Sequence, residues 1–93
     1  DVKVCGYVYD DENKQPITSG GTVILMLPVS NRFANINREG YFEFSKLPQD
    51  TYEIYTSIQK YIDKKVVVTV MQGEIKRVDI YCTHEQFEEP LWG

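Results

Sequence analysis

Long apolar runs are missing from this 93-residue sequence. The longest lie at residues 23–27 and 66–68, whereas a membrane-spanning helix needs roughly 20 apolar residues. Basic residues are also the minority, with 10 Lys and Arg against 14 Asp and Glu and a net charge of −4. Because nucleic-acid binding relies on basic stripes that displace counterions from phosphates, this balance argues against a nucleic-acid partner. We expect one small domain with a single core and no membrane span.

Cysteine and histidine are scarce, with two Cys and one His in the whole sequence. Alternation along the predicted strands points Cys5 outward and Cys82 toward the core, so the thiols lie on opposite faces of a sheet. A disulfide needs Cα atoms within about 7 Å and converging side chains. We therefore expect two free thiols. With His84 alone and no Cys-x-x-Cys pair, no metal, cofactor or catalytic site is expected.

Alternation of apolar and polar residues runs through most of the chain, which indicates strands. We predict seven strands, at residues 2–9, 22–27, 32–37, 41–45, 51–58, 64–70 and 75–82. Turn signals separate them at a spacing of roughly 8–12 residues, which is typical of an antiparallel β-sandwich. The alternation predicts a core made of Val4, Val8, Val23, Leu25, Leu27, Phe42, Phe44, Leu47, Tyr52, Ile54, Val66, Val68, Val70, Val78 and Ile80.

The same strands carry a series of spaced motifs. They are Gly6-x-Val8-x-Asp10, Pro16-Ile17, Gly21-x-Val23-x-Leu25, Gly40-x-Phe42-x-Phe44, Leu47-Pro48, Thr51-Tyr52-x-Ile54, Tyr61, Val66-x-Val68-x-Val70, Gly73 and Val78-x-Ile80. Together they resemble carboxypeptidase regulatory-like domains. The resemblance implies an all-β, seven-stranded, transthyretin-like Greek-key sandwich over residues 1–82, usually an accessory module of secreted or surface proteins. Residues 83–93 form an acidic and aromatic tail outside this pattern. The family usually has Gly where Asp50 stands, and Asp tolerates left-handed conformations.

Related sandwiches carry chemistry, and this sequence departs from each of them. Lys3 and Asp79 stand roughly where pilin-type Cna B domains form an isopeptide bond, but Thr56 replaces the expected catalytic Glu. Without a buried carboxyl to move protons, we expect only a solvated charge pair. The His and Arg cluster of hydroxyisourate hydrolases and the Tyr and His iron ligands of intradiol dioxygenases are also missing. We expect no enzymatic activity.

The turn at residues 10–13 is strongly acidic, and clustered carboxylates of this kind can bind calcium. It lacks the Asp-x-Asp-x-Asp-Gly spacing of a dedicated calcium loop. We expect a solvated turn.

Tyrosine is abundant, with seven in the chain. Alternation places Tyr7, Tyr9, Ile75 and Tyr81 on outward positions, and the resemblance makes their two strands neighbours. Tyrosine suits an ordinary exposed strand as well as a binding surface, so both interpretations stay open. These residues, with Trp92 of the tail, are our candidate contact surface. In the competing account, the tail folds back and covers this surface with Phe87, Leu91 and Trp92.

The expected function is a non-catalytic accessory module for protein contact or domain spacing in a secreted, periplasmic or cell-surface protein. A carbohydrate-binding module that uses the outward tyrosines is the alternative. A protein partner or neighbouring domain is expected, with the chain itself a monomer or a weak homodimer and no cofactor.

Overall fold

The computed structural model describes residues 1–86, and that part of the chain contains eight strands and no helix. Accordingly, none of the described residues form a helix that could cross a membrane. The strands are β1 (Val2–Asp10), β2 (Thr22–Leu25), β3 (Arg32–Asn35), β4 (Tyr41–Leu47), β5 (Asp50–Ser57), β6 (Lys65–Val70), β7 (Ile75–Arg77) and β8 (Ile80–Cys82).

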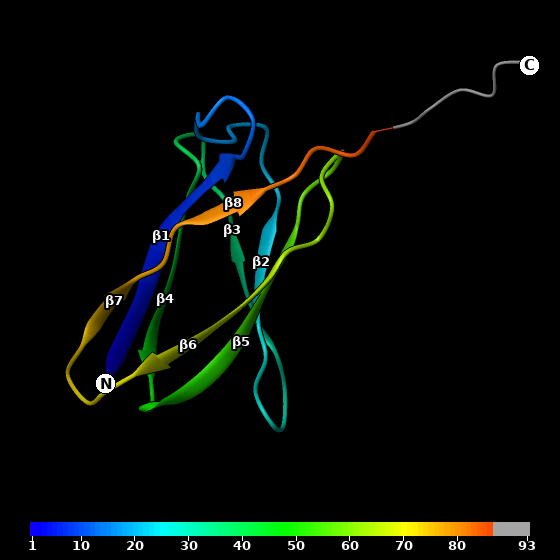
Figure 1. Cartoon of the computed structure of the whole chain (residues 1–93). Helices are drawn as coiled ribbons and strands as arrows, with labels where there is room; N and C mark the ends of the chain where they lie inside the picture. The colour runs from blue at the N-terminus through cyan, green and yellow to red at the C-terminus, as the bar shows by residue number, and fades with distance from the viewer. Residues whose placement is uncertain (87–93) are drawn as a thin grey trace, which may run out of the picture.

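Two sheets pack face to face (Figure 1). One has the order β4-β1-β7, with β8 also paired to β1, and the other has the order β3-β2-β5-β6. The chain passes from β3 to β4 through a tight turn in which Gly40 has a φ of 81° and Asn37 Oδ1 accepts the N–H of Tyr41 at 2.9 Å. The predicted all-β sandwich is confirmed.

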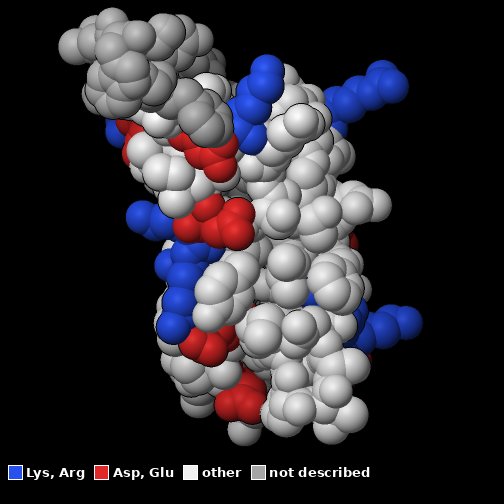
Figure 2. All heavy atoms as spheres, turned by 90° about the vertical axis from the view of Figure 1, so that its right-hand side faces the viewer, with Lys and Arg blue, Asp and Glu red and all other residues white. Residues whose placement is uncertain are grey.

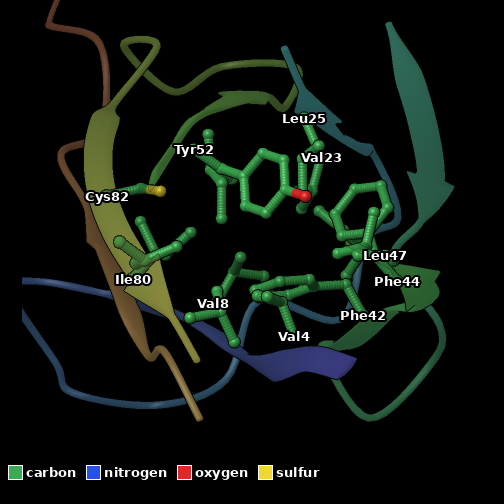
Figure 3. Close-up of a cluster of buried hydrophobic side chains, with 14 of the residues drawn as sticks. Val4, Val8, Val23, Leu25, Phe42, Phe44, Leu47, Tyr52, Ile80 and Cys82 are labelled. Carbon is green, nitrogen blue, oxygen red and sulfur yellow. The ribbon is translucent and has the colours of Figure 1, made fainter. Parts of the chain in front are cut away.

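The core lies between the sheets, as the alternation predicted. Figure 3 shows Val4 and Val8 of β1 facing Tyr52 and Leu25 of the opposite sheet. Every predicted core residue is buried except Leu27, Val66 and Val78, which are partly buried and pack against the core. The predicted core omits six further buried side chains, of which alternation had already pointed that of Cys82 inward: Val2, Ile17, Ile36, Thr56, Ile58 and Cys82.

The last predicted strand differs from the observed one, because it divides into β7 and β8 at residues 78–79. There the N–H of Tyr7 is donated to the Asp79 carboxylate at 3.1 Å, in place of a backbone carbonyl. Both pieces pair with β1 in parallel, whereas we expected antiparallel pairing throughout. Residue alternation is the same in both directions, which is why it could not reveal this.

The turn before β5 also differs from expectation. Asp50 begins β5, and its Oδ1 accepts the N–H of Thr51 at 2.7 Å. The left-handed backbone in this region falls instead on Lys46, with a φ of 59°.

Candidate contact surface

The outer face of the β4-β1-β7 sheet carries most of the predicted surface. Because neighbouring residues of a strand point to opposite faces, Val4 and Val8 are buried while Tyr7 and Tyr9 are half-buried on the outside. The strand register then sets their neighbours. Tyr7 lies opposite Tyr41 of β4, and Tyr9 lies opposite Tyr81 of β8.

These four tyrosines form a continuous row across the sheet, which we call the tyrosine ladder (Tyr41, Tyr7, Tyr9 and Tyr81). Ring centroids are 5.2 Å apart for Tyr41 and Tyr7, in an edge-to-face arrangement. They are 6.2 Å apart for Tyr7 and Tyr9, and 5.0 Å for Tyr9 and Tyr81, which are stacked. Such pairs add about 0.5–1.5 kcal/mol beyond their buried area, so the rings hold one another in place.

Two cations lie over the ladder. The Arg77 guanidinium is 5.2 Å from the centroid of Tyr7, and the Lys14 ammonium is 5.4 Å from that of Tyr81. Both distances are within cation–π range. Asp79 fixes Arg77, with Arg77 Nε donating to Asp79 Oδ1 at 3.2 Å, and this hydrogen bond raises the pKa of the guanidinium.

Tyr41 lies at one end of the ladder and makes a hydrogen bond through its hydroxyl. Its hydroxyl donates to Glu43 Oε1 at 3.0 Å. Desolvation raises the pKa of Tyr41 well above its usual value, and the neighbouring Cys5 and Glu43 raise it further. The phenol therefore stays neutral and serves as a donor at physiological pH.

The structure brings only part of the predicted surface together. Tyr7, Tyr9 and Tyr81 are in contact, whereas Ile75, 71% exposed, lies toward the other end of β1 opposite Lys3. Trp92 lies outside the described residues, as do the other aromatic residues of the tail. The prediction did not include Tyr41, Arg77 or Lys14. Tyr41 already had an outward position in the alternation, but only the β1–β4 register places it beside Tyr7.

The residues considered for isopeptide chemistry have other partners. Lys3 Nζ is 3.4 Å from Glu43, and Asp79 binds Arg77 and the N–H of Tyr7. Thr56 is buried, and its hydroxyl oxygen accepts the N–H of Lys64 at 2.8 Å. This arrangement leaves Lys3 and Asp79 in separate charge pairs.

The acidic turn uses its carboxylates within the fold. Asp10 Oδ1 accepts the N–H groups of Glu12 and Asn13, and its Oδ2 accepts the Tyr61 hydroxyl at 2.7 Å. Asp11 accepts the hydroxyl of Thr83 at 2.6 Å. Over residues 1–86, the His, Cys, Asp and Glu side chains form no group of three that could hold a metal ion.

Both cysteines are free, as predicted: Cys5 is half-buried on the outer face and Cys82 is buried. Burial raises the pKa of the Cys82 thiol. The Cys82 thiol is therefore poorly suited to act as a nucleophile.

Two packed sheets with these pairings define a β-sandwich of the transthyretin-like class. No protein-family model and no curated protein matches this chain, so the resemblance to carboxypeptidase regulatory-like domains stays a prediction.

Solved structures do share the fold. The chain is similar to a proposed carbohydrate binding protein of Bacteroides uniformis, with a TM-score of 0.72 and 14% identity over 88% of this chain and 41% of that one. It is similar to the pilus 2b backbone protein of group B streptococcus, with a TM-score of 0.73 and 11% identity over 90% and 41%. It is also similar to the 5-hydroxyisourate hydrolase of Klebsiella pneumoniae, with a TM-score of 0.69 and 13% identity over 92% and 93%. The chain thus spans about two fifths of the first two proteins, and identities this low establish the fold alone.

Proposed function

We propose that this chain is a non-catalytic accessory β-sandwich module that contacts another protein through the tyrosine ladder. The observation that carries the proposal is the row of four touching rings with Arg77 and Lys14 over it. Tyrosine and arginine are enriched among the residues that dominate protein–protein binding energy. Rings already held by their neighbours also lose little conformational entropy when a partner docks.

Carbohydrate binding is the second candidate. Support comes from the similarity to a proposed carbohydrate binding protein and from the exposed ring of Tyr81. A sugar that stacks on Tyr7 or Tyr81 would compete with Arg77 or Lys14 for the ring face. This competition favours a protein partner, whose carboxylates and carbonyls can bind the two cations where they lie.

The proposed setting is outside the cytoplasm, in a secreted, periplasmic or cell-surface protein. The sequence resemblance implies this location, and the similarity to a pilus backbone protein supports it. The chain spans only part of that protein, so a position within a longer surface protein is part of the proposal.

The test is site-specific photo-cross-linking in the native host. A photoreactive residue replaces Tyr81 in one variant and Tyr55, half-buried on the outer face of the other sheet, in a matched control. We expect the Tyr81 variant to cross-link to one protein other than this chain, which excess unlabelled domain displaces, and the Tyr55 variant not to cross-link to that protein.

A glycan panel read by tyrosine fluorescence covers the second candidate. Quenching by a polysaccharide that Tyr81→Ser abolishes would favour carbohydrate binding. Equal cross-linking from both positions, or none from either with no glycan response, would remove the ladder as the contact surface.

A further inference from the structure

The sandwich has four outer strand edges among its described residues: β4 and the β7/β8 pair in one sheet, β3 and β6 in the other. An edge strand presents unpaired N–H and C=O groups to any other strand. Folded proteins therefore interrupt, shorten or charge their edges. Comparing the four edges shows which of them can accept another strand.

Three of the edges are protected. β4 is interrupted at Lys46, where φ is 59°, and its register with β1 shifts between Val2 and Val4. β3 has four residues, and Arg32 of β3 donates to the Ser45 carbonyl of β4 at 2.9 Å. β7 and β8 have three residues each, and β7 presents Lys76 and Arg77.

The edge of β6 has no such protection. Its six residues, Lys65–Val70, contain no Pro or Gly and consist of valines, a threonine and one lysine. That lysine is already paired, since Lys65 Nζ is 2.8 Å from Glu53 of β5. A run this rich in β-branched residues fits a sheet well.

The hydrogen-bond pattern identifies which groups of β6 face outward. Lys64 accepts the N–H of Thr56 at 2.9 Å, so even-numbered residues of this segment bond to β5. The odd-numbered Lys65, Val67 and Thr69 therefore direct their backbone groups away from β5. Within residues 1–86, β6 pairs with no strand other than β5.

The outer face beside this edge carries one ion pair among uncharged residues, since Thr51, Glu53 and Tyr55 of β5 lie opposite Thr69, Val67 and Lys65. Val67 is 59% exposed, whereas exposed Phe33 belongs to β3, at the opposite edge of the sheet. Figure 2 shows the side of the molecule on which β2 and β5 lie in Figure 1, with charged side chains along its left border and few over its lower right part. A strand added at β6 would meet Val67 and Thr69 beside the mutually neutralised Lys65–Glu53 pair.

We propose that β6 pairs antiparallel with β6 of a second copy of this chain, about a two-fold axis at Val67. Val67 then faces Val67 of the second copy, and Lys65 faces Thr69, with each facing pair exchanging both backbone hydrogen bonds. On the inner side, half-buried Val66 meets Val68 of the second copy.

Charge selects this register, in which the outward residues of β6 fit those of a second copy. An axis at Lys65 would set the two lysines against each other, and like charges directly opposite are destabilising. An axis at Thr69 would leave Lys65 beyond the end of the paired segment. The axis at Val67 places no like charges together and pairs all three outward residues. A two-fold axis also closes the assembly at two chains. This inference goes beyond the proposed contact function, because it leaves both tyrosine ladders uncovered.

The first experiment is cross-linking of a single thiol in a Cys5→Ser background, with buried Cys82 unchanged. In Val67→Cys, the two-fold axis places the introduced thiols on facing residues, whose Cα atoms lie about 5.5 Å apart. A short bis-maleimide should therefore give a covalent dimer. Met71→Cys, at a residue 61% exposed, is the matched control. In the same register its two copies lie roughly 26 Å apart, at about 3.3 Å per residue, and should not cross-link.

The second experiment is sedimentation equilibrium of the full chain. We expect the molar mass to rise with concentration from 10.8 kDa toward twice that value. Val67→Lys puts two ammonium groups at the axis and should weaken the dimer tenfold or more, while Val67→Thr should keep it. Thermal unfolding of each variant verifies the fold.

Tyr81→Ser should also keep the dimer, which separates this test from that of the contact function. A chain that stays monomeric at millimolar concentration would overturn the proposal. Equal cross-linking at residues 67 and 71, or a dimer that Val67→Lys leaves unchanged, would overturn it as well.

Discussion

Gly6 lies in β1 beside Val78, in the break between β7 and β8. A Cβ at this residue would overlap the carbonyl oxygen of Val78 and come within 2.6 Å of its carbonyl carbon. These are backbone atoms, so no change of side-chain rotamer relieves the overlap. On either side of Gly6, Cys5 accepts the N–H of Val78 at 2.8 Å and Tyr7 donates to Asp79, which holds the break in place.

Gly6→Ala should therefore lower the free energy of unfolding by about 3 kcal/mol or more, as severe overpacking does. Urea unfolding followed by circular dichroism measures the loss. Gly20→Ala is the matched control, because Gly20 has a φ of 91° but no atom beyond its two chain neighbours lies within 4 Å of its Cβ position. Backbone strain alone should cost the control about 1–2 kcal/mol. Equal losses in the two variants would contradict the close approach at Gly6.

The residues that the sequence could not assign are those whose partners are distant in the chain. Thr56 has the inward position of β5, where alternation predicts an apolar residue, and it is tolerated because Lys64 and Cys82 donate to its hydroxyl. Ile17 lies outside both the predicted and the observed strands, so no two-residue period identifies it as core. Ile36 and Ile58 lie just beyond the observed strands but inside the predicted ranges 32–37 and 51–58, and Ile58 continues the inward series of Tyr52 and Ile54. Tyr7, Tyr9 and Tyr81 were assigned to one face because a single pairing, that of the first and last strands, places them there.

At the scale of elements, the segment after β8 is bound to the loop between β5 and β6. Ile62 donates to the Thr83 carbonyl at 2.9 Å, and Glu85 donates to the Lys60 carbonyl at 2.8 Å. The ring of Tyr61 meets that of His84 edge to face, with centroids 5.0 Å apart. Since Tyr61 also donates to Asp10, one side chain joins the end of β1, this loop and the chain beyond residue 82.

The pKa values of the Tyr61–Asp10 pair predict how this connection depends on pH. Desolvation and the hydrogen bond to Asp10 raise the pKa of Tyr61 to about 12, from an ordinary value of 10.0. The same bond is the main cause that lowers the pKa of Asp10. A raised tyrosine pKa stabilises the fold below pH 10, and this contribution is lost as the pH rises through about 12. A lowered aspartate pKa stabilises it above the ordinary aspartate value, and this contribution is lost as the pH falls through the lowered pKa.

We therefore expect Tyr61→Phe to lower the thermal midpoint most between about pH 5 and pH 10, with the difference from wild type shrinking on either side. Tyr81→Phe, on the outer face of β8, controls for loss of a hydroxyl. A difference that stays constant from pH 3 to pH 12 would show that Tyr61 contributes through packing alone.

Strand directions mark the limit of what the sequence predicted about the elements. The seven predicted ranges fall on observed strands, because alternation is local and reports burial directly. The division of 75–82 into β7 and β8 depends on a side chain, Asp79, that replaces a backbone acceptor for Tyr7. The parallel course of these strands beside β1 depends on how the chain crosses between sheets, and neither feature changes the alternation.

For the whole molecule, the tyrosine ladder and the β6 edge lie on different sheets. A module with this layout can use one sheet to bind a partner and the other to meet its own copy. Two linked ladders would bind a repeated partner with an avidity greater than the affinity of either, provided that the geometry allows both to engage.

The parallel pairing of the first and last strands has a mechanical consequence. Val2 lies at one end of the sandwich and Cys82, opposite Asp10, at the other (Figure 1). Tension between these two points slides β1 against β7 and β8 along their length, so their hydrogen bonds carry the load together. Tension between Val2 and Leu47, which are paired neighbours on antiparallel strands, separates the bonds one after another.

Single-molecule pulling between residues 2 and 85 should therefore require a clearly higher unfolding force than pulling between residues 2 and 47 at the same rate, since forced unfolding follows the unfolding rate along the pulled direction. Equal forces would show that the terminal strands do not carry the load. With this geometry, a domain inserted in a longer chain transmits tension from end to end as a stiff link and yields only when its central strand slips.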